Sequence, residues 1–284
     1  MSKRQNPSER TADQNSGTQL GAWLLGLSVA VLPLCMNLKM EDSFDLPKWT
    51  VLTLSVAAVW LLLGRQWLKE KNALTIRTSQ LDLPLLGFLV VGILSSFFSL
   101  DKADSLWGFY RIYTFGWFPT FMLAVLFWSG LQILKPADTR WIIPTILTVA
   151  AAIAIYGLLQ YAGREIFSRM PKGPGLRTWA TLGNPIYLGA YLMMTLLVAF
   201  HSFIQKPGFL KGGLCLLLAC SLFFTFSRGA WLGTGLGALW LLWQFRFSQG
   251  IGKTLRNVGL ILCLSTAVLW PVIKKNVLPR WQIG

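Results

Sequence analysis

The sequence has few of the groups that soluble enzymes commonly use: one histidine, four cysteines, and 11 aspartates and glutamates among 284 residues. It contains no Walker loop, no GxSxG elbow, no paired cysteines and no HExxH zinc motif, which excludes the enzyme classes that depend on those motifs. The cysteines lack metal-ligand spacing and lie in apolar runs, so we predict small core residues; they are Cys35, Cys215, Cys220 and Cys263. We expect no metal and no cofactor.

Apolar residues dominate the chain instead. They make up 54% of it against 13% charged residues, and the mean hydropathy of +0.53 is far too high for a soluble domain of this length. The 14 tryptophans and 18 phenylalanines are typical of helices with aromatic belts, and apolar runs of roughly twenty residues favour helices over barrel strands. We predict an all-α fold, a polytopic transmembrane helical bundle of about nine spans.

The formal net charge of +15 comes from 26 basic residues that are spread over short loops. No basic helix interleaved with aromatic residues is present, so the charge does not indicate nucleic acid as a partner. Anionic lipid head groups or an anionic lipid-linked substrate are the partners that this pattern favours.

The order of polar and apolar segments predicts the organisation of the chain. Residues 1–19 are polar and lack an apolar run, which predicts a disordered cytoplasmic tail before a transmembrane domain over residues 20–284. The predicted spans cover about Leu20 to Leu38, Trp49 to Gly64, Leu83 to Leu100, Trp117 to Leu134, Trp141 to Gln160, Ile186 to Ile204, two marginal helices within Leu210 to Phe245, and Val258 to Ile273.

Basic loops predict the sidedness of these spans. Arg65, Lys69, Lys71 and Arg77 place the loop after the second span in the cytoplasm, which puts the acidic linker before that span outside. By alternation the long polar stretch from Arg164 to Arg177 also lies outside, although its basic residues prefer the inside. Either the span count is off by one, or these charges stay outside because they bind an anion.

Two arginines, Arg177 and Arg228, interrupt the most apolar part of the chain together with a Gly-Asn-Pro turn. Gly183 and Pro185 predict this turn, with the proline near the first position of the helix that follows. Arg228 is the only formal charge between Lys211 and Arg246, and it stands in a Ser-Arg-Gly triplet that we interpret as an outer interhelical turn. Gly229 would free the backbone to turn, and the Ser227 hydroxyl would bond an orphan amide. A guanidinium matches phosphate oxygens with a bidentate fork. The alternative is an arginine that snorkels at the end of a helix.

The segments RTWATLGNPIYLGAYL and TFSRGAWLG, with SLWGFYRIYTFGWF before them, resemble the O-antigen ligase and polymerase superfamily of bacterial envelope proteins. The resemblance implies an inner-membrane enzyme that moves a glycan from undecaprenyl pyrophosphate to a glycan or lipid acceptor at the periplasmic face, with outward arginines that hold the pyrophosphate. Arg228 matches the arginine of the SRG motif and Arg177 is the candidate for the second. Arg111, Arg169 and Asn184 are candidates for further contacts.

The resemblance also implies a catalytic histidine in a large late periplasmic loop, and no such region is present before Gly284. We therefore expect an amino-terminal portion of such an enzyme, and the catalytic residue stays unassigned. His201 is predicted at the inner end of its span. Six acids are predicted in outer loops and are candidate bases: Glu41, Asp42, Asp45, Asp101, Asp104 and Glu165. A transporter of the kind linked to inorganic carbon uptake in one branch of the superfamily, or an inactive scaffold, remains the alternative function.

Overall fold

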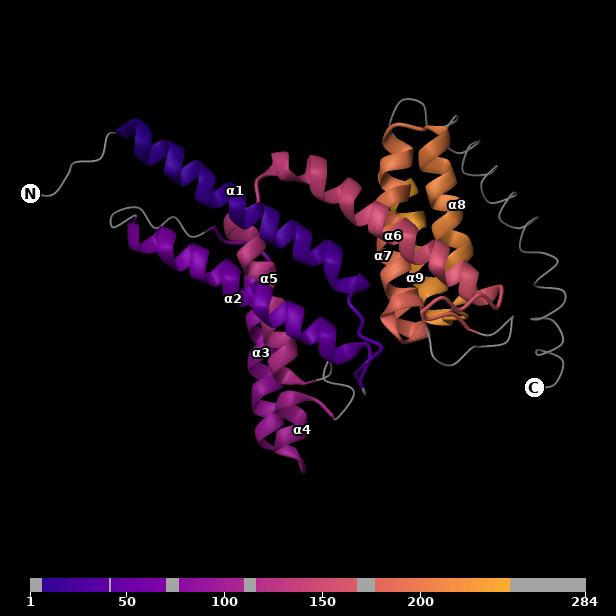
Figure 1. Cartoon of the computed structure of the whole chain (residues 1–284), viewed down its shortest axis with the longest axis horizontal. Helices are drawn as coiled ribbons and strands as arrows, with labels where there is room; N and C mark the ends of the chain where they lie inside the picture. Colours follow the sequence, from indigo (N-terminus) through magenta and orange to yellow (C-terminus); the bar gives the residue numbers. More distant parts are fainter. Residues whose placement is uncertain (1–6, 41, 70–76, 110–115, 168–176, 246–284) are drawn as a thin grey trace, which may run out of the picture. The chain divides into compact units, whose positions relative to one another are not determined.

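The structure is a computed structural model that describes residues 7–40, 42–69, 77–109, 116–167 and 177–245 (Figure 1). Within these ranges the chain forms helices and connecting turns and no strand, which confirms the all-helical prediction. The helices are α1 (Pro7–Val31), α2 (Asp45–Lys69), α3 (Asp82–Phe97), α4 (Lys102–Trp107), α5 (Trp117–Ile133), α6 (Thr139–Tyr161), α7 (Pro185–Gln205), α8 (Phe209–Phe224) and α9 (Arg228–Phe245). Short 3₁₀ turns are η1 (Leu32–Leu34), η3 (Pro136–Asp138) and η4 (Ala180–Leu182).

The predicted spans from the third to the eighth match α3 and α5 to α9 closely, whereas the first two have different limits. Helix α1 begins at Pro7, inside the segment whose composition predicts disorder, because proline at the first helical position loses no hydrogen bond. Helix α2 begins at Asp45, before the predicted limit at Trp49, and contains Pro47 in its first turn, where a proline is tolerated for the same reason. The predicted ninth span lies outside the described residues.

Three helical stretches are long and apolar enough to cross a membrane by length and composition: Asp45–Arg65, Pro136–Tyr161 and Pro185–Gln205. Four shorter apolar helices accompany them, at Gln19–Leu34, Asp82–Phe97, Trp117–Ile133 and Phe209–Phe224. Large apolar side chains also remain exposed on these helices; for example, Leu83 is 79% exposed and Phe88 is 63% exposed. Apolar helix faces of this extent are typical of contact with lipid or with another protein.

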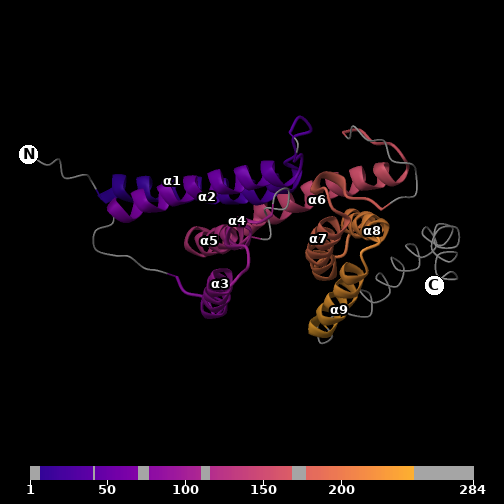
Figure 2. The same cartoon turned by 90° about the horizontal axis from the view of Figure 1, so that it is seen from below.

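The chain divides into two compact units, residues 1–145 and 146–284, and the division falls inside α6 next to Pro144. In the first unit, α1 and α2 lie side by side and both pack against α5, which also contacts α3 (Figures 1 and 2). Its core comprises Ala22, Leu25, Leu52, Val56, Val59, Leu63, Leu126 and Ile133. Trp23 stacks on Trp141 at a ring-centroid distance of 4.3 Å, which ties α1 to the beginning of α6.

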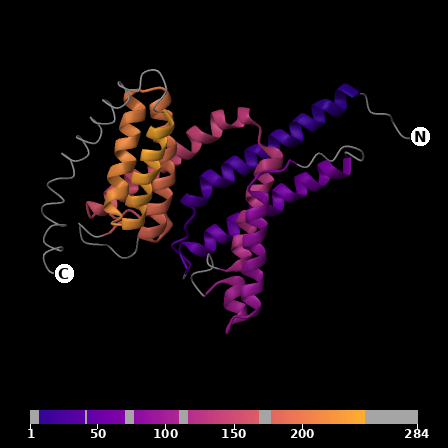
Figure 3. The same ribbon diagram turned by 180° about the vertical axis from the view of Figure 1, so that it is seen from behind.

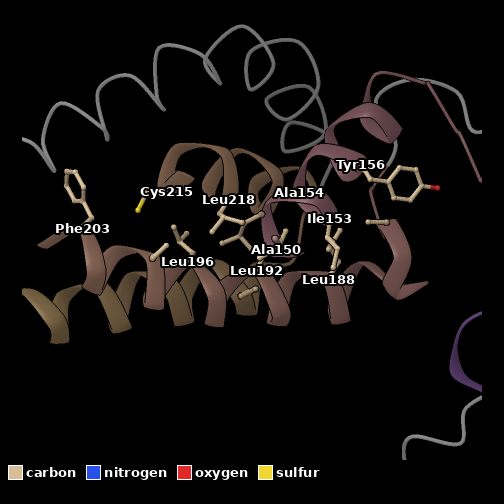
Figure 4. Packing of buried hydrophobic residues seen from close by; sticks show 14 residues of the cluster. Ala150, Ile153, Ala154, Tyr156, Leu188, Leu192, Leu196, Phe203, Cys215 and Leu218 are labelled. Atoms are coloured by element: carbon tan, nitrogen blue, oxygen red, sulfur yellow. The ribbon is translucent and has the colours of Figure 1, made fainter. Parts of the chain in front are cut away.

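In the second unit, α7 is the central helix and packs against both α8 and α9 (Figures 2 and 3). Figure 4 shows the resulting row of buried side chains, with Leu192 of α7 next to Leu218 of α8 and Ala150 of α6, and Leu188 of α7 next to Ile153 of α6. Tyr156 lies at one end of this row, and its hydroxyl points away from the core. Cys215 and Cys220 are buried, as predicted, whereas Cys35 is only partly buried and Cys263 lies outside the described residues.

Glycines allow α7 and α9 to approach closely. A Cβ on Gly189 would lie 2.8 Å from the Ser227 Cβ and 3.1 Å from the Ala230 Cβ. Further along the interface, Gly233 and Gly237 face Met193 and Leu197 of α7. The GTGLG stretch thus has the packing role that small residues have in most membrane helices. This packing holds the beginning of α9 against the beginning of α7.

Candidate anion site at the arginine turn

The Gly-Asn-Pro turn forms as the sequence predicts. Gly183 has a φ of 76°, a left-handed conformation that glycine adopts at little cost, and Pro185 is the first residue of α7. Asn184 is the N-cap, since its side-chain oxygen accepts a hydrogen bond from the Ile186 N–H at 2.8 Å. Asn184 therefore has a structural role, and its predicted contact with a ligand stays a prediction.

The Ser-Arg-Gly triplet also lies at an interhelical turn, but two details of the prediction are wrong. Gly229 is already within α9, and the residue with positive φ is Phe226, at 52°. The Thr225 hydroxyl accepts a hydrogen bond from the Ser227 N–H at 3.2 Å. The hydroxyl that bonds an amide in this turn is therefore that of Thr225 and not that of Ser227. The turn is tightened because the Thr225 hydroxyl donates in turn to the Leu222 carbonyl at 2.7 Å.

Arg177 contacts this turn directly. Its Nε donates to the Thr225 carbonyl oxygen at 2.9 Å, and the neighbouring Thr178 N–H donates to the Phe224 carbonyl oxygen at 3.2 Å. These bonds satisfy two of the carbonyls that the end of α8 leaves without an intrahelical donor. They attach Arg177 to the turn three residues before Arg228.

Both arginine side chains are exposed. Because Nε of Arg177 is engaged by the turn, its Nη1 and Nη2 groups are the ones that can form an end-on fork to two anion oxygens. Arg228 begins α9, where the first backbone N–H groups and the helix dipole favour negative charge. Positive charge and backbone donors thus gather at one end of the second unit.

Backbone strain concentrates at the same place. Among the described residues, the only non-glycine residues with positive φ are Ala180, at 47°, and Phe226. Ala180 follows Arg177 by three residues and Phe226 precedes Arg228 by two. Conformations of this kind persist where the surrounding structure holds them, and they cluster at binding and catalytic sites.

Residues that the sequence analysis did not single out build the support of the turn. Thr225 is fully buried, and Trp231 of α9 donates from its indole Nε1 to the Leu222 carbonyl at 3.3 Å and stacks on Phe223 at 5.2 Å. Gln160 in the last turn of α6 accepts hydrogen bonds from the segment after Arg177. The sequence signal that could have pointed to this support is Gln160 itself, an amide side chain at the end of an apolar run.

His201 does not join this cluster, as its place on α7 shows. Arg111 and Arg169 lie outside the described residues. His201 is near the other end of α7, roughly 24 Å along the axis from Pro185 at about 1.5 Å per residue. Its Nε2 pairs with the Gln205 side chain at 2.9 Å, and its ring contacts Phe245. His201 is therefore not a base for chemistry at the arginine turn.

The candidate acids have varied positions. Asp42 accepts hydrogen bonds from the first two amides of α2, and Asp101 is the N-cap of α4, so these two carboxylates hold helix ends. Glu165 accepts a hydrogen bond from the Tyr156 hydroxyl. Glu41 lies outside the described residues. Within the described ranges no group of three or more histidine, cysteine or carboxylate side chains is placed to hold a metal ion.

Comparison of the chain with protein-family models, with curated proteins and with solved structures found no match.

Proposed function

We propose that this chain binds the pyrophosphate of an isoprenoid-linked glycan and takes part in transfer of that glycan to an acceptor at the outer face of a bacterial inner membrane. The carrying observation is the 2.9 Å bond from Arg177 Nε to the Thr225 carbonyl, which attaches one exposed arginine to the turn that presents the other. Two guanidinium groups on one turn suit a dianionic or trianionic ligand, and pyrophosphate is the common anion of that charge at a membrane surface.

The chemistry of glycan transfer explains why such a site would help. When an acceptor hydroxyl attacks the anomeric carbon, the bond from that carbon to the pyrophosphate oxygen breaks and negative charge builds on the leaving group. Guanidinium groups and helix amides that are already in place stabilise this charge without reorganisation during the reaction. A neighbouring apolar surface, of the kind that α7 to α9 expose, suits the isoprenoid chain of the donor.

A direct binding experiment tests the proposed function. We expect the purified chain in detergent to bind farnesyl pyrophosphate, a short stand-in for the natural donor, at least tenfold more tightly than farnesyl monophosphate, because only the pyrophosphate reaches both arginines. Isothermal titration with the two ligands measures the difference. Equal affinity for both ligands would show that lipid partitioning alone accounts for the binding.

We further propose about nine spans with a cytoplasmic amino terminus, the segment around Lys69 inside and the segment around Arg169 outside, as the basic residues from Arg65 to Arg77 and alternation require. This arrangement puts the arginine turn at the periplasmic face. After removal of native thiols, an impermeant thiol reagent added to intact cells should label Arg169→Cys and spare Lys69→Cys. Labelling of position 69 with position 169 protected would invert the topology and sink the assignment of an outer site.

A further inference from the structure

The segment that carries Arg177 is fastened to the helices by one buried side chain. The Gln160 Oε1 accepts hydrogen bonds from the backbone N–H groups of Trp179 at 3.1 Å and of Ala180 at 2.8 Å. Gln160 is 6% exposed and Ala180 is 1% exposed, so water cannot readily replace the bond between them. An acceptor shared by two consecutive amides restrains the backbone, and loss of the acceptor would leave the buried Ala180 N–H without this hydrogen bond.

The conformation of Ala180 explains why this restraint matters. Its φ of 47° is unfavourable for a residue with a Cβ, and a free segment would leave that conformation. Toward Arg177, the same segment is bonded at Thr178 N–H and at the Arg177 side chain to the end of α8. The segment from Arg177 to Ala180 is thus bonded at one end to the arginine turn and at the other to Gln160.

The packing beneath the segment leaves little room for an alternative path. Gly157, one turn before Gln160 on α6, approaches both Ser221 of α8 and Ala180; a Cβ at Gly157 would lie 3.0 Å from the Ser221 Oγ and 4.0 Å from the Ala180 Cβ. Ser221 is fully buried. Gln160 therefore holds the segment from Arg177 to Ala180 where α6 packs closely against α8. A shift of this segment would also shift Arg177.

We propose that Gln160 is the positioning residue of the arginine site: by clamping Trp179 and Ala180 it sets the place of the Arg177 guanidinium, and so the affinity for a pyrophosphate that it does not itself touch. This inference rests on the proposed function for the identity of the ligand. The clamp itself rests on the hydrogen bonds and burial alone.

The test removes the acceptor and keeps the volume. Gln160→Met should weaken the binding of farnesyl pyrophosphate about tenfold, since the two bonds that hold the segment are lost. Gln160→Glu keeps an oxygen at the same distance and should restore most of the affinity, whereas a purely steric role predicts parent-like affinity for both variants. Amide hydrogen exchange at Trp179 and Ala180 should accelerate in Gln160→Met and return toward the parent rate in Gln160→Glu, with or without ligand.

A matched control exists in the other unit. Gln132 also clamps a backbone, since its Oε1 accepts from the Arg77 N–H at 3.0 Å and its Nε2 donates to the Arg77 carbonyl at 2.9 Å. Gln132→Met should leave pyrophosphate affinity unchanged. Where Gln160→Met does not fold, Gln160→Asn, whose oxygen is one methylene short of the two amides, should give the same loss.

The outcomes separate the two proposals. Parent-like affinity and parent-like exchange in Gln160→Met would overturn the positioning role and leave the pyrophosphate site standing. A parent chain that does not bind farnesyl pyrophosphate would overturn the proposed function, and with it the effect of Gln160 on a ligand, while exchange at Trp179 and Ala180 would still decide whether the clamp exists.

Discussion

The double variant Arg177→Ala/Arg228→Ala should bind farnesyl pyrophosphate about 100-fold or more weakly than the parent chain. Each guanidinium is expected to contribute one charge-assisted contact, worth about 1.5–3 kcal/mol, and every 1.4 kcal/mol is about a tenfold change in affinity. Arg228→Lys alone should weaken binding nearly as much as Arg228→Ala, since lysine keeps the charge and loses the fork. Titration calorimetry in detergent measures all four proteins under one condition.

Arg77 provides the control for this experiment. It is an exposed arginine whose Nη1 donates to the Leu134 carbonyl at 3.1 Å, so it resembles Arg177 in exposure and in its bond to a carbonyl, but it lies in the first unit. Arg77→Ala should leave the affinity within about twofold of the parent, because Arg77 is not part of the arginine turn and the effect of an exposed charge outside the site is screened by salt. Parent-like binding by the double variant would instead support the interpretation that Arg228 merely snorkels at a helix end.

Replacement of Gly189 by leucine should destabilise the second unit by about 3 kcal/mol, at the upper end of the usual cost of overpacking. Even a Cβ at Gly189 would lie only 2.8 Å from the Ser227 Cβ, just before α9, and 3.1 Å from the Ala230 Cβ within α9. Neither Cβ can move without its backbone. The helices would have to separate next to the arginine turn. Thermal or denaturant unfolding of the purified protein in detergent, followed by helical circular dichroism, measures the loss.

Gly235→Leu is the matched control, because Gly235 is on the same helix α9 and a Cβ there meets nothing within 4 Å. Leucine is a better helix former than glycine by somewhat under about 1 kcal/mol, so this variant should be as stable as the parent or slightly more so. Equal stability of the two leucine variants would contradict close packing of α7 on α9.

Much of the secondary structure was readable from the sequence because its causes are local. Apolar runs of helical length placed α3 and α5 to α9, and Gly183 with Pro185 marked the boundary before α7. Helix α2 begins at Asp45, four residues before the predicted span, because Pro47 in the first turn has no intrahelical bond to lose. The start of α1 was missed because polar composition says little about a helix that continues from an apolar one.

The sequence by itself determined that this is an all-helical, apolar chain with a glycine-proline turn before α7 and an arginine at the turn before α9. Only the tertiary structure decided that Arg177 bonds to Thr225, 48 residues away, and that Gln160 holds Ala180, 20 residues away. It also showed that Phe226, and not Gly229, adopts the left-handed conformation in the turn before α9. The reason is physical: caps and helical runs depend on neighbouring residues, whereas these contacts exist only once α7, packed against α8 and α9, brings distant backbone groups within hydrogen-bond reach.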